Sequence, residues 1–274
     1  MLSLKKQAIL EKRRANTSTQ MLGYVNHEIR NPLNVIKGLV QFILQNMIQI
    51  NMENVEKIGI DKPVFDTMIS DLSTVAGSCS MLEYIITDIL DIQKLESGKL
   101  ELNNKWIKIN HFLNDIFKTI SQKIDEKQTV KFKQLYEPTL SLYFDKYRMK
   151  QILLNFLTNA IKYTTNGEIT LKIELIDNFY RFSVKDTGKG IHEEAKNKIF
   201  QPFNQTNVND ASRYGGIGLG LHLCKMLSER MGGSIGFEST FGYGSIFWVD
   251  FPRHIVQPPQ MEQDMKFDIN IIEI

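Results

Sequence analysis

The chain has 274 residues, of which 42% are hydrophobic and 23% charged, and its formal net charge at pH 7 is +2. This length fits one or two domains, and the composition is typical of globular proteins rather than disordered or collagen-like ones. Charged or amide residues interrupt every apolar run before it reaches the length of a membrane span, and the first residues lack a signal-peptide pattern. The two cysteines are too few for a disulfide scaffold or a cysteine-based zinc site, and the near-neutral charge argues against nucleic acid as the main partner.

Two long helices are predicted in the N-terminal third. Apolar residues recur at spacings of three and four over residues 22–47 and again over residues 65–89, which is the heptad pattern of helices that pack side by side. Asp61 can cap the second helix, and Gly98 can end it. Two antiparallel helices of this length expose two apolar seams. A second hairpin would cover both, so we predict a homodimer that forms a four-helix bundle.

From about residue 106 the pattern changes to short strands between helices. Strands are predicted at residues 129–136, 140–144, 168–176, 179–184, 233–238 and 244–251, and helices at residues 110–126, 146–163 and 219–230. This order favours an α/β sandwich with a mixed sheet, so the predicted fold class of the whole chain is α+β. The predicted domains are a helical hairpin (1–98), a linker (99–105), an α/β domain (106–254) and a C-terminal tail or linker (255–274).

The histidine of the first helix has unusual surroundings. His27 lies at the heptad position that points directly away from the apolar seam, and Pro32 removes an amide donor and crowds the carbonyl of Glu28, so the helix should bend there. One interpretation is a surface histidine beside a tolerated kink. The other is a nucleophile, since a neutral imidazole can attack phosphorus while the neighbouring carboxylate orients the ring and takes its proton.

Two amides follow each other along one face of the helix predicted at 146–163. Asn155, Asn159 and Tyr163 are spaced by four and lie at the edge of the apolar stripe. A half-buried amide there needs a partner. The amides are either structural, bonded to a neighbouring loop, or they offer oxygen to Mg²⁺, a hard cation that keeps several waters and binds substrate phosphates.

Two glycine-rich segments follow. Asp186, Gly188 and Gly190 come directly after a predicted strand; they form either a tight turn or a site where the carboxylate accepts a hydrogen bond from the amine of adenine. The segment 215–220 opens the helix predicted at 219–230, and successive amides at a helix N-terminus bind anions. The glycine spacing fits neither a Rossmann fingerprint nor a Walker A loop.

Taken together, these segments resemble the two-component sensor histidine kinases. The string His27-Glu28-Ile29-Arg30-Asn31-Pro32-Leu33-Asn34 resembles the H-box of that family, and residues 155–164, 186–191, 199–203 and 215–220 resemble its N-, G1-, F- and G2-boxes in the same order. The resemblance implies a HisKA-type dimerisation domain followed by a GHKL-type, Bergerat-type ATP-binding domain. It further implies that His27 accepts the phosphoryl group, that Glu28 is its acid/base partner, and that Asn31 positions water for dephosphorylation of a partner.

The same resemblance implies ATP and Mg²⁺ as cofactors. It assigns Mg²⁺ to Asn159, adenine to Asp186 and Tyr163, the phosphates to Lys162, and the γ-phosphate to Arg213. The remaining nucleotide-binding residues that it implies are Asn155, Gly188, Gly190, Ile191, Gly216, Gly218, Leu219 and Gly220.

The expected function is therefore that of a protein histidine kinase that uses ATP to phosphorylate His27 and passes the group to an aspartate of a response-regulator receiver domain. Alternatives are a protein that mainly dephosphorylates the receiver through Asn31, a non-catalytic dimeric scaffold that binds nucleotide, and an ATPase of the gyrase, Hsp90 and MutL group, which has no counterpart of the His27 helix. Expected partners are a second copy and a receiver domain, with no nucleic acid and no membrane span in this chain. We expect it in the cytoplasm, either alone or as the intracellular portion of a larger membrane-attached protein.

Overall fold

The computed structural model describes residues 33–45, 47, 62–125, 129–204, 218–253 and 270–273, with residues 122, 123, 125 and 270–273 described by their backbone alone. The chain divides into two compact units, Met1–Leu100 and Glu101–Ile274. We call them the hairpin unit and the sheet unit, and each is described by itself. Within the described residues, no helix combines the length and the apolar composition of a membrane span.

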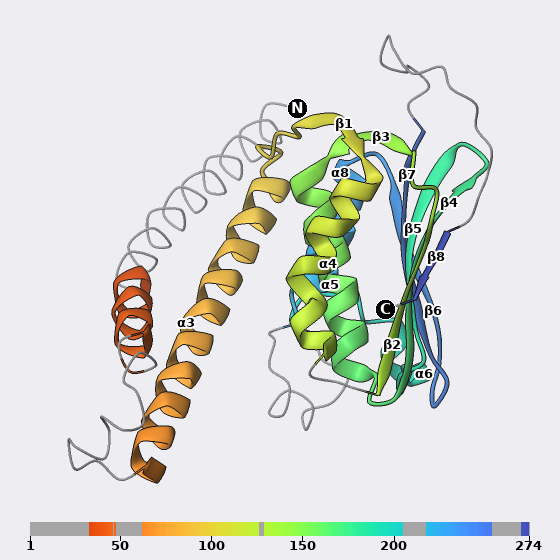
Figure 1. Ribbon diagram of the computed structural model, residues 1–274. Coiled ribbons are helices and arrows are strands. Elements are labelled where there is room, and N and C mark those ends of the chain that lie inside the picture. Colours follow the sequence, from red (N-terminus) through yellow and green to blue (C-terminus); the bar gives the residue numbers. More distant parts are fainter. Residues whose placement is uncertain are drawn as a thin grey trace, which may run out of the picture. The chain divides into compact units, whose positions relative to one another are not determined.

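In the described part of the hairpin unit, two helices run antiparallel, as predicted. Residues 33–45 form the first, and α3 (Lys62–Glu96) is the second (Figure 1). Leu33 packs with Cys79 at the middle of α3 and with Ile86 in its C-terminal half, whereas Met47 packs with Phe65 near its beginning. Because early residues of one helix meet late residues of the other, the two helices run in opposite directions.

The C-terminal end of α3 confirms the predicted glycine cap. Gly98 has a φ of +66°, in the left-handed region that glycine adopts without strain. Its amide donates to the carbonyl oxygen of Leu95 at 3.0 Å, and the amide of Lys99 donates to that of Lys94 at 2.9 Å. This pair of bonds is a Schellman motif, which satisfies carbonyl groups that the helix end would otherwise leave open.

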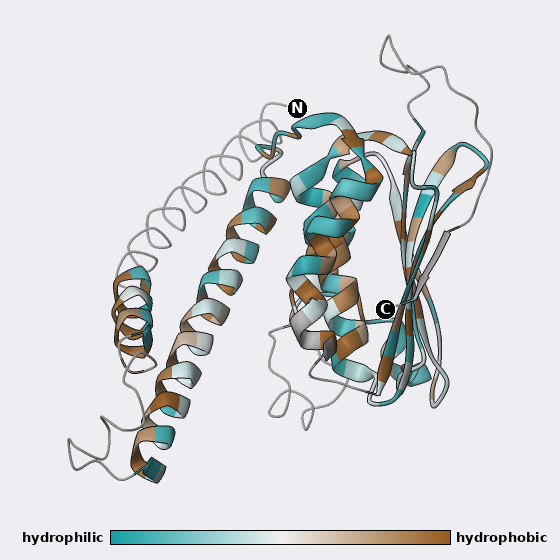
Figure 2. Cartoon of the chain, viewed as in Figure 1, coloured by the Kyte–Doolittle hydropathy of each residue, from teal (hydrophilic) through white to brown (hydrophobic). Residues whose placement is uncertain are grey.

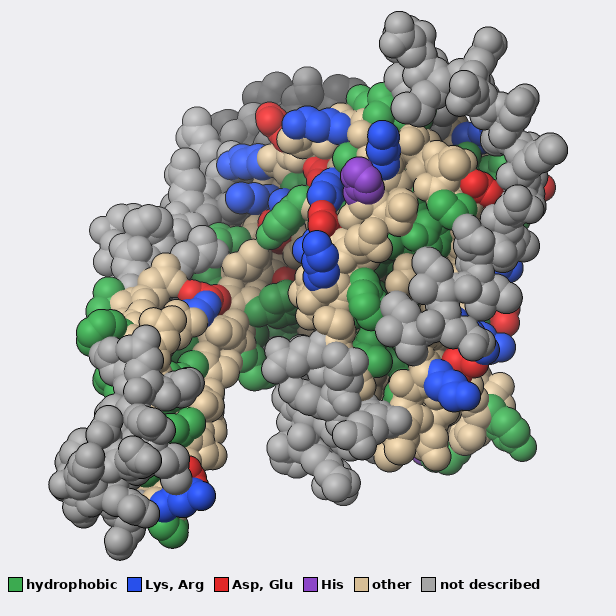
Figure 3. Space-filling view, viewed as in Figure 1, with side chains coloured by type: hydrophobic (Ala, Val, Ile, Leu, Met, Phe, Trp, Pro, Cys, Tyr) green, Lys and Arg blue, Asp and Glu red, His purple; other side chains and the backbone are tan. Residues whose placement is uncertain are grey.

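The apolar stripe predicted on α3 divides into two rows of residues spaced by seven. One row lies inside the hairpin: Phe65, Cys79 and Ile86 are buried, and Leu72 packs against Phe65. The other row is open to solvent: the exposed fractions are 46% for Met68, 42% for Val75 and 49% for Leu82. Hydrophobic residues therefore recur along the whole of α3 (Figure 2), and hydrophobic side chains reach the surface of the hairpin unit (Figure 3).

The sheet unit is built from a six-stranded mixed sheet, a two-stranded sheet and helices. Its described elements in chain order are β1 (Asn104–Lys108), α4 (Ile109–Asp125), β2 (Val130–Tyr136), β3 (Ser141–Asp145), α5 (Lys146–Tyr163), β4 (Gly167–Ile176), β5 (Phe179–Asp186), α6 (Glu193–Lys196), α8 (Gly220–Arg230), β6 (Ser234–Thr240), β7 (Gly244–Pro252) and β8 (Asn270–Glu273). The large sheet has the order β6-β7-β5-β4-β2-β8, and β1 pairs with β3. Only β2 and β4 are parallel among these pairs. The helices α4, α5 and α8 cover one face of the sheet (Figure 1), which confirms the predicted α/β sandwich.

The core of the sheet unit lies between these helices and the sheet and is rich in aromatic rings. Phe144 meets Phe112 and Phe182 edge-to-face, with ring centroids 5.3 and 6.1 Å apart. Each of these three rings is at most 1% exposed. Asp145 then caps α5: its Oδ1 accepts from the amides of Tyr147 and Arg148. These contacts fix α5, whose C-terminal half carries the predicted amides.

Three elements were not predicted. β1 begins at Asn104, inside the segment expected to be a linker, and β8 lies within the expected tail. The short helix α6 follows His192. β1 and β8 are strands of four or five residues that exist because a partner strand lies beside them, β3 for the first and β2 for the second. Such short segments carry too little periodicity of their own to indicate a strand.

Candidate nucleotide-binding site

The C-terminal half of α5 brings the two predicted amides against the start of α8. Asn159 Nδ2 donates to Asn155 Oδ1 at 3.2 Å, one helical turn away. A Cβ atom on Gly220 would lie 1.9 Å from Asn155 Nδ2, so a side chain at this position would collide with the amide. Glycine at the first position of α8 therefore lets the amide pair and the helix N-terminus approach each other, which brings together two segments that are far apart in sequence.

The amide pair fits a magnesium ligand. The bond between the two side chains uses Nδ2 of Asn159 and so leaves its Oδ1 available to a cation. Oxygen is the ligand atom that Mg²⁺ prefers, and one protein ligand is enough when phosphates and water complete the shell. No group of three or more His, Cys, Asp or Glu residues that could hold a metal occurs among the described residues.

Asp186 ends β5 and is only 6% exposed. Its Oδ1 accepts from the amide of Gly188 at 2.8 Å, and its carboxylate also accepts from the backbone amide of Ser245. Burial raises the pKa of Asp186, and the two hydrogen bonds offset only part of that increase. The result is a buried acceptor held by backbone on two sides, which suits recognition of an amine such as that of adenine.

Gly188 brings the loop after β5 close to the end of α5. A Cβ atom on Gly188 would lie 2.5 Å from the carbonyl oxygen of Tyr163, a distance that no side chain allows. The amide of Lys189 donates to the same oxygen at 3.3 Å. Asp186 is therefore held next to the residues that end α5, and the structure joins the two predicted motifs here.

Two lysines flank the ring of Tyr163. The Nζ atom of Lys162 lies 4.9 Å from the ring centroid and that of Lys189 lies 4.7 Å from it. This gathers positive charge at the end of α5, where a nucleotide's phosphates would be attracted. Lys189 was not among the predicted site residues. Its position between the glycines of the Asp186 motif was the signal that could have indicated it.

Most of the other predicted glycines lie in tight backbone contacts. Gly190 has a φ of +67°, and a Cβ there would be 2.2 Å from the carbonyl oxygen of Thr240. Gly218 has a φ of +77° and packs on the backbone of Asn204. Leu219 is buried directly before α8. Ile191 is half-buried, and its amide donates to Ser239 Oγ at 2.9 Å.

Five of the predicted site residues lie outside the described part of the chain. They are His27, Glu28, Asn31, Arg213 and Gly216. Their roles stay predictions, as does the bend expected at Pro32.

Family comparisons agree with the division into two units. Residues 17–98 match the family described as the His Kinase A (phospho-acceptor) domain. Residues 144–255 match the family described as histidine kinase-, DNA gyrase B-, and HSP90-like ATPase. The second match covers the amide pair, Asp186 and the segment that opens α8.

Similar proteins include sensor proteins of bacteria. The chain is 34% identical to the sensor protein GacS of Pseudomonas syringae pv. syringae over 276 residues, which cover 98% of this chain and 28% of that protein. It is 36% identical to the aerobic respiration control sensor protein ArcB homolog of Haemophilus influenzae over 225 residues, or 81% of this chain and 63% of that protein. The chain thus spans little more than a quarter of the length of GacS.

Solved structures with a similar fold include one described as a histidine kinase. Full-length ShkA in complex with AMPPNP has a TM-score of 0.67 and 30% identity, with 88% of this chain and 47% of that chain covered. The histidine kinase AdeS of Acinetobacter baumannii has a TM-score of 0.56 with 78% of this chain and 95% of that chain covered, and its 21% identity supports the fold alone.

Proposed function

Because this chain belongs to the two-component sensor histidine kinases, we propose that it uses ATP to phosphorylate its own His27 and passes the phosphoryl group to an aspartate of a response-regulator receiver domain. The observation that carries the proposal is the convergence, within the sheet unit, of a buried carboxylate, an amide pair and a helix N-terminus. Asp186, Asn159 and Gly220 come from three elements, and close contacts that only glycine permits, at Gly188 and Gly220, bring these elements together.

Each group has a role in binding ATP. The carboxylate of Asp186 accepts a hydrogen bond from the exocyclic amine of adenine. Lys162 meets the phosphates, and Gly218 and Gly220 bring backbone amides of the α8 N-terminus to them. Asn159, with Asn155 beside it, would hold Mg²⁺ through its oxygen. The ion would supply charge neutralisation on the phosphates, which is the main requirement of phosphoryl transfer.

In the proposed reaction, the hairpin unit supplies the nucleophile His27 and the sheet unit supplies the bound ATP. A nitrogen lone pair of the His27 imidazole attacks the γ-phosphorus, the bond from that phosphorus to the β–γ bridging oxygen breaks, and ADP leaves. The imidazole then carries an extra positive charge, and Glu28 takes the proton from the other ring nitrogen. In the second step an aspartate oxygen of the receiver attacks the same phosphorus, the P–N bond breaks with its electron pair left on the nitrogen, and Glu28 returns the proton to the other ring nitrogen. ATP and receiver domains are found in the cytoplasm, where we propose that this segment works.

A homodimer is part of the proposal. The row of Met68, Val75 and Leu82 on α3 is between 42 and 49% exposed. Ile36 and Ile43 of the first helix, also seven residues apart, are 48 and 44% exposed. Two rows of this kind match the seam that remains open on each hairpin of a four-helix bundle, which supports association of two copies.

The kinase proposal is tested with γ-labelled ATP on the purified chain. We expect label that is stable in alkali and lost in acid, as a phosphorus–nitrogen bond requires, and none in His27→Gln. His111→Gln is the matched control, because His111 is an exposed histidine of α4 that the proposal does not use, and it should keep the label. Undiminished label in His27→Gln would overturn the proposal. In a subsequent transfer assay, a receiver domain that gains the label and keeps it would distinguish a kinase from a protein that mainly dephosphorylates its receiver.

A further inference from the structure

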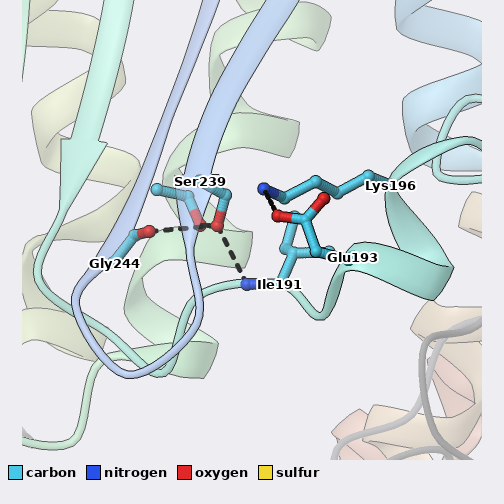
Figure 4. A network of polar contacts seen from close by, with 6 residues as sticks. Ile191, Glu193, Lys196, Ser239 and Gly244 are labelled. Carbon is cyan, nitrogen blue, oxygen red and sulfur yellow. Dashed lines mark hydrogen bonds and ion pairs between the residues drawn. The ribbon is translucent and has the colours of Figure 1, made fainter.

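One hydroxyl joins the β6–β7 turn to the loop that follows Asp186. The Oγ atom of Ser239 accepts from the amide of Ile191 at 2.9 Å and donates to the carbonyl oxygen of Gly244 at 3.0 Å (Figure 4). It also lies 2.9 Å from Oγ of Ser245. A serine hydroxyl has one hydrogen to donate and two lone pairs to accept with. These three contacts use all of that capacity when the Ser245 hydroxyl donates to Ser239.

Both sides of this network lead to the nucleotide site. Ser245 faces Asp186 in the pairing of β5 with β7, and its backbone amide donates to the Asp186 carboxylate. On the other side, Ile191 is the last residue of the glycine-rich segment that begins at Asp186. Ser239 therefore links β7, whose Ser245 amide binds the Asp186 carboxylate, to Ile191 at the end of the loop that begins at Asp186.

Backbone contacts tighten the same junction. The amide of Gly242 donates to the carbonyl oxygen of Lys189 at 2.7 Å, and a Cβ on Gly190 would lie 2.2 Å from the carbonyl oxygen of Thr240. The rings of His192 and Phe241 stack with centroids 3.5 Å apart. Several contacts thus join the loop to the turn, and Ser239 is the side chain that connects their polar groups. Glu193 pairs separately with Lys196 beside it (Figure 4).

We propose that Ser239 is a positioning residue for the nucleotide: its hydroxyl fixes the backbone of Ile191, and with it the loop after Asp186, in the geometry that recognises adenine. The inference rests on the proposed function, because it takes Asp186 as the adenine acceptor. Ser239 itself touches no reacting atom. It acts through Ile191 and Ser245, so its loss should weaken nucleotide binding and leave the phosphoryl-transfer step itself unchanged.

Three variants of the full chain test this: Ser239→Ala, Ser239→Thr and Lys196→Ala. We measure the ADP dissociation constant, the KM for ATP and the autophosphorylation rate at saturating ATP. For Ser239→Ala we expect both the ADP dissociation constant and the KM to rise about 5- to 20-fold, with the saturated rate within about twofold of wild type. Ser239→Thr keeps the hydroxyl and should recover most of the affinity. Lys196→Ala breaks the neighbouring ion pair and should change neither constant.

Distinct outcomes separate this inference from the function on which it rests. Equal ADP affinity in wild type and Ser239→Ala would overturn the inference alone. A lower autophosphorylation rate at saturating ATP with an unchanged KM in Ser239→Ala would also overturn it. So would a loss of ADP affinity in Ser239→Ala that is accompanied by a lowered melting temperature and that Ser239→Thr does not recover. If the wild-type chain binds no ADP, the proposed function fails and the inference fails with it.

Discussion

The two units bury their hydrophobic residues in different ways. In the sheet unit, the large rings of Phe112, Phe144, Phe156 and Phe182 are at most 1% exposed, because helices and sheet close over them. In the hairpin unit, α3 has two rows of hydrophobic residues with the same seven-residue spacing. One row lies inside the hairpin and the other is exposed. The sheet unit encloses these core rings within one chain. The hairpin unit leaves one row uncovered, and an apolar surface of this kind indicates a site of association.

The first helix of the hairpin, like α3, has both buried and exposed hydrophobic residues. Leu33 and Val40 are buried at 7 and 8% exposure, whereas Val35, Leu39 and Phe42 are 61, 57 and 62% exposed. A helix that is apolar well beyond the side facing its partner requires further cover. We therefore expect substitutions in the two units to have separable effects, on folding and nucleotide binding in one and on association in the other.

The largest effect is expected from Phe156→Ala. This ring of α5 is 1% exposed and lies 5.7 Å from that of Phe247, so its removal leaves a cavity. We expect the unfolding free energy of the sheet unit to fall by about 3–5 kcal/mol, with loss of nucleotide binding and an unchanged oligomeric state. Both tryptophans, Trp106 and Trp248, lie in the sheet unit, so tryptophan fluorescence during denaturant unfolding measures this unit alone.

The matched control is Tyr243→Ala, because that aromatic ring is 81% exposed. Its removal should change the same free energy by no more than about 0.5 kcal/mol. A loss of association in Phe156→Ala would contradict the separation of the two units.

The second prediction concerns the exposed row. Val75→Glu places a carboxylate in the proposed seam between two hairpins, where it would be desolvated without a partner. We expect the dimer dissociation constant to rise at least about 100-fold, measured by sedimentation, with ADP affinity within about twofold of wild type. Ser70→Glu adds the same charge at an exposed position on another face of α3 and should leave the dimer intact. A wild-type chain that is monomeric at all concentrations would refute the dimer.

Much of each unit could be predicted from the sequence because its signals are local. The helix predicted at 146–163 has those same bounds as α5, since Asp145 is a strong N-cap and the apolar spacing is regular. The fold class follows in the same way from the order of strands and helices. Heptad spacing predicted the stripe on α3, but not which of its two rows is buried, because both rows have the same periodicity.

The contacts that assemble the site could not be predicted, because they join residues that are distant in sequence. Ser239 and Ile191 are 48 residues apart, and no motif relates them. The position of Lys189 beside Tyr163 likewise depends on how the loop after β5 reaches the end of α5. The sequence indicates which residue types are present, whereas the sheet order decides which of them meet.

The third prediction separates binding from folding within the sheet unit. Asp186→Asn keeps the shape of the side chain but removes the charged acceptor, so we expect the ADP dissociation constant to rise about 10- to 30-fold with the protein still folded. The wild type should also lose affinity on acidification. Since burial raises the pKa of Asp186, its carboxylate takes up a proton at a higher pH than an ordinary aspartate, and the loss should begin correspondingly early.

A fluorescent ADP analogue, titrated between about pH 7 and about pH 4.5, measures this loss. In Asp186→Asn the same titration should be nearly flat across the range in which the wild type loses affinity. Parallel curves for the two proteins would mean that another group controls the pH dependence.

The smallest expected effect is the coupling free energy of an ion pair, and one pair from each unit can be compared. In the sheet unit, Arg181 donates twice to Asp250, at 2.7 Å each, and its guanidinium lies 4.6 Å from the ring centroid of Trp248. In the hairpin unit, Lys37 pairs with Glu83 through one contact, and both side chains are about a quarter exposed. Two planar, parallel bonds lose less side-chain entropy per bond than a single flexible contact. Double-mutant cycles of unfolding free energy should therefore give a coupling of about 1–2 kcal/mol for Arg181–Asp250 and about 0.5 kcal/mol for Lys37–Glu83. If the coupling free energy of Lys37–Glu83 equals that of Arg181–Asp250, ion pairs stabilise the hairpin unit as strongly as the sheet unit. The two units would then differ in how they bury hydrophobic residues but not in the strength of their ion pairs.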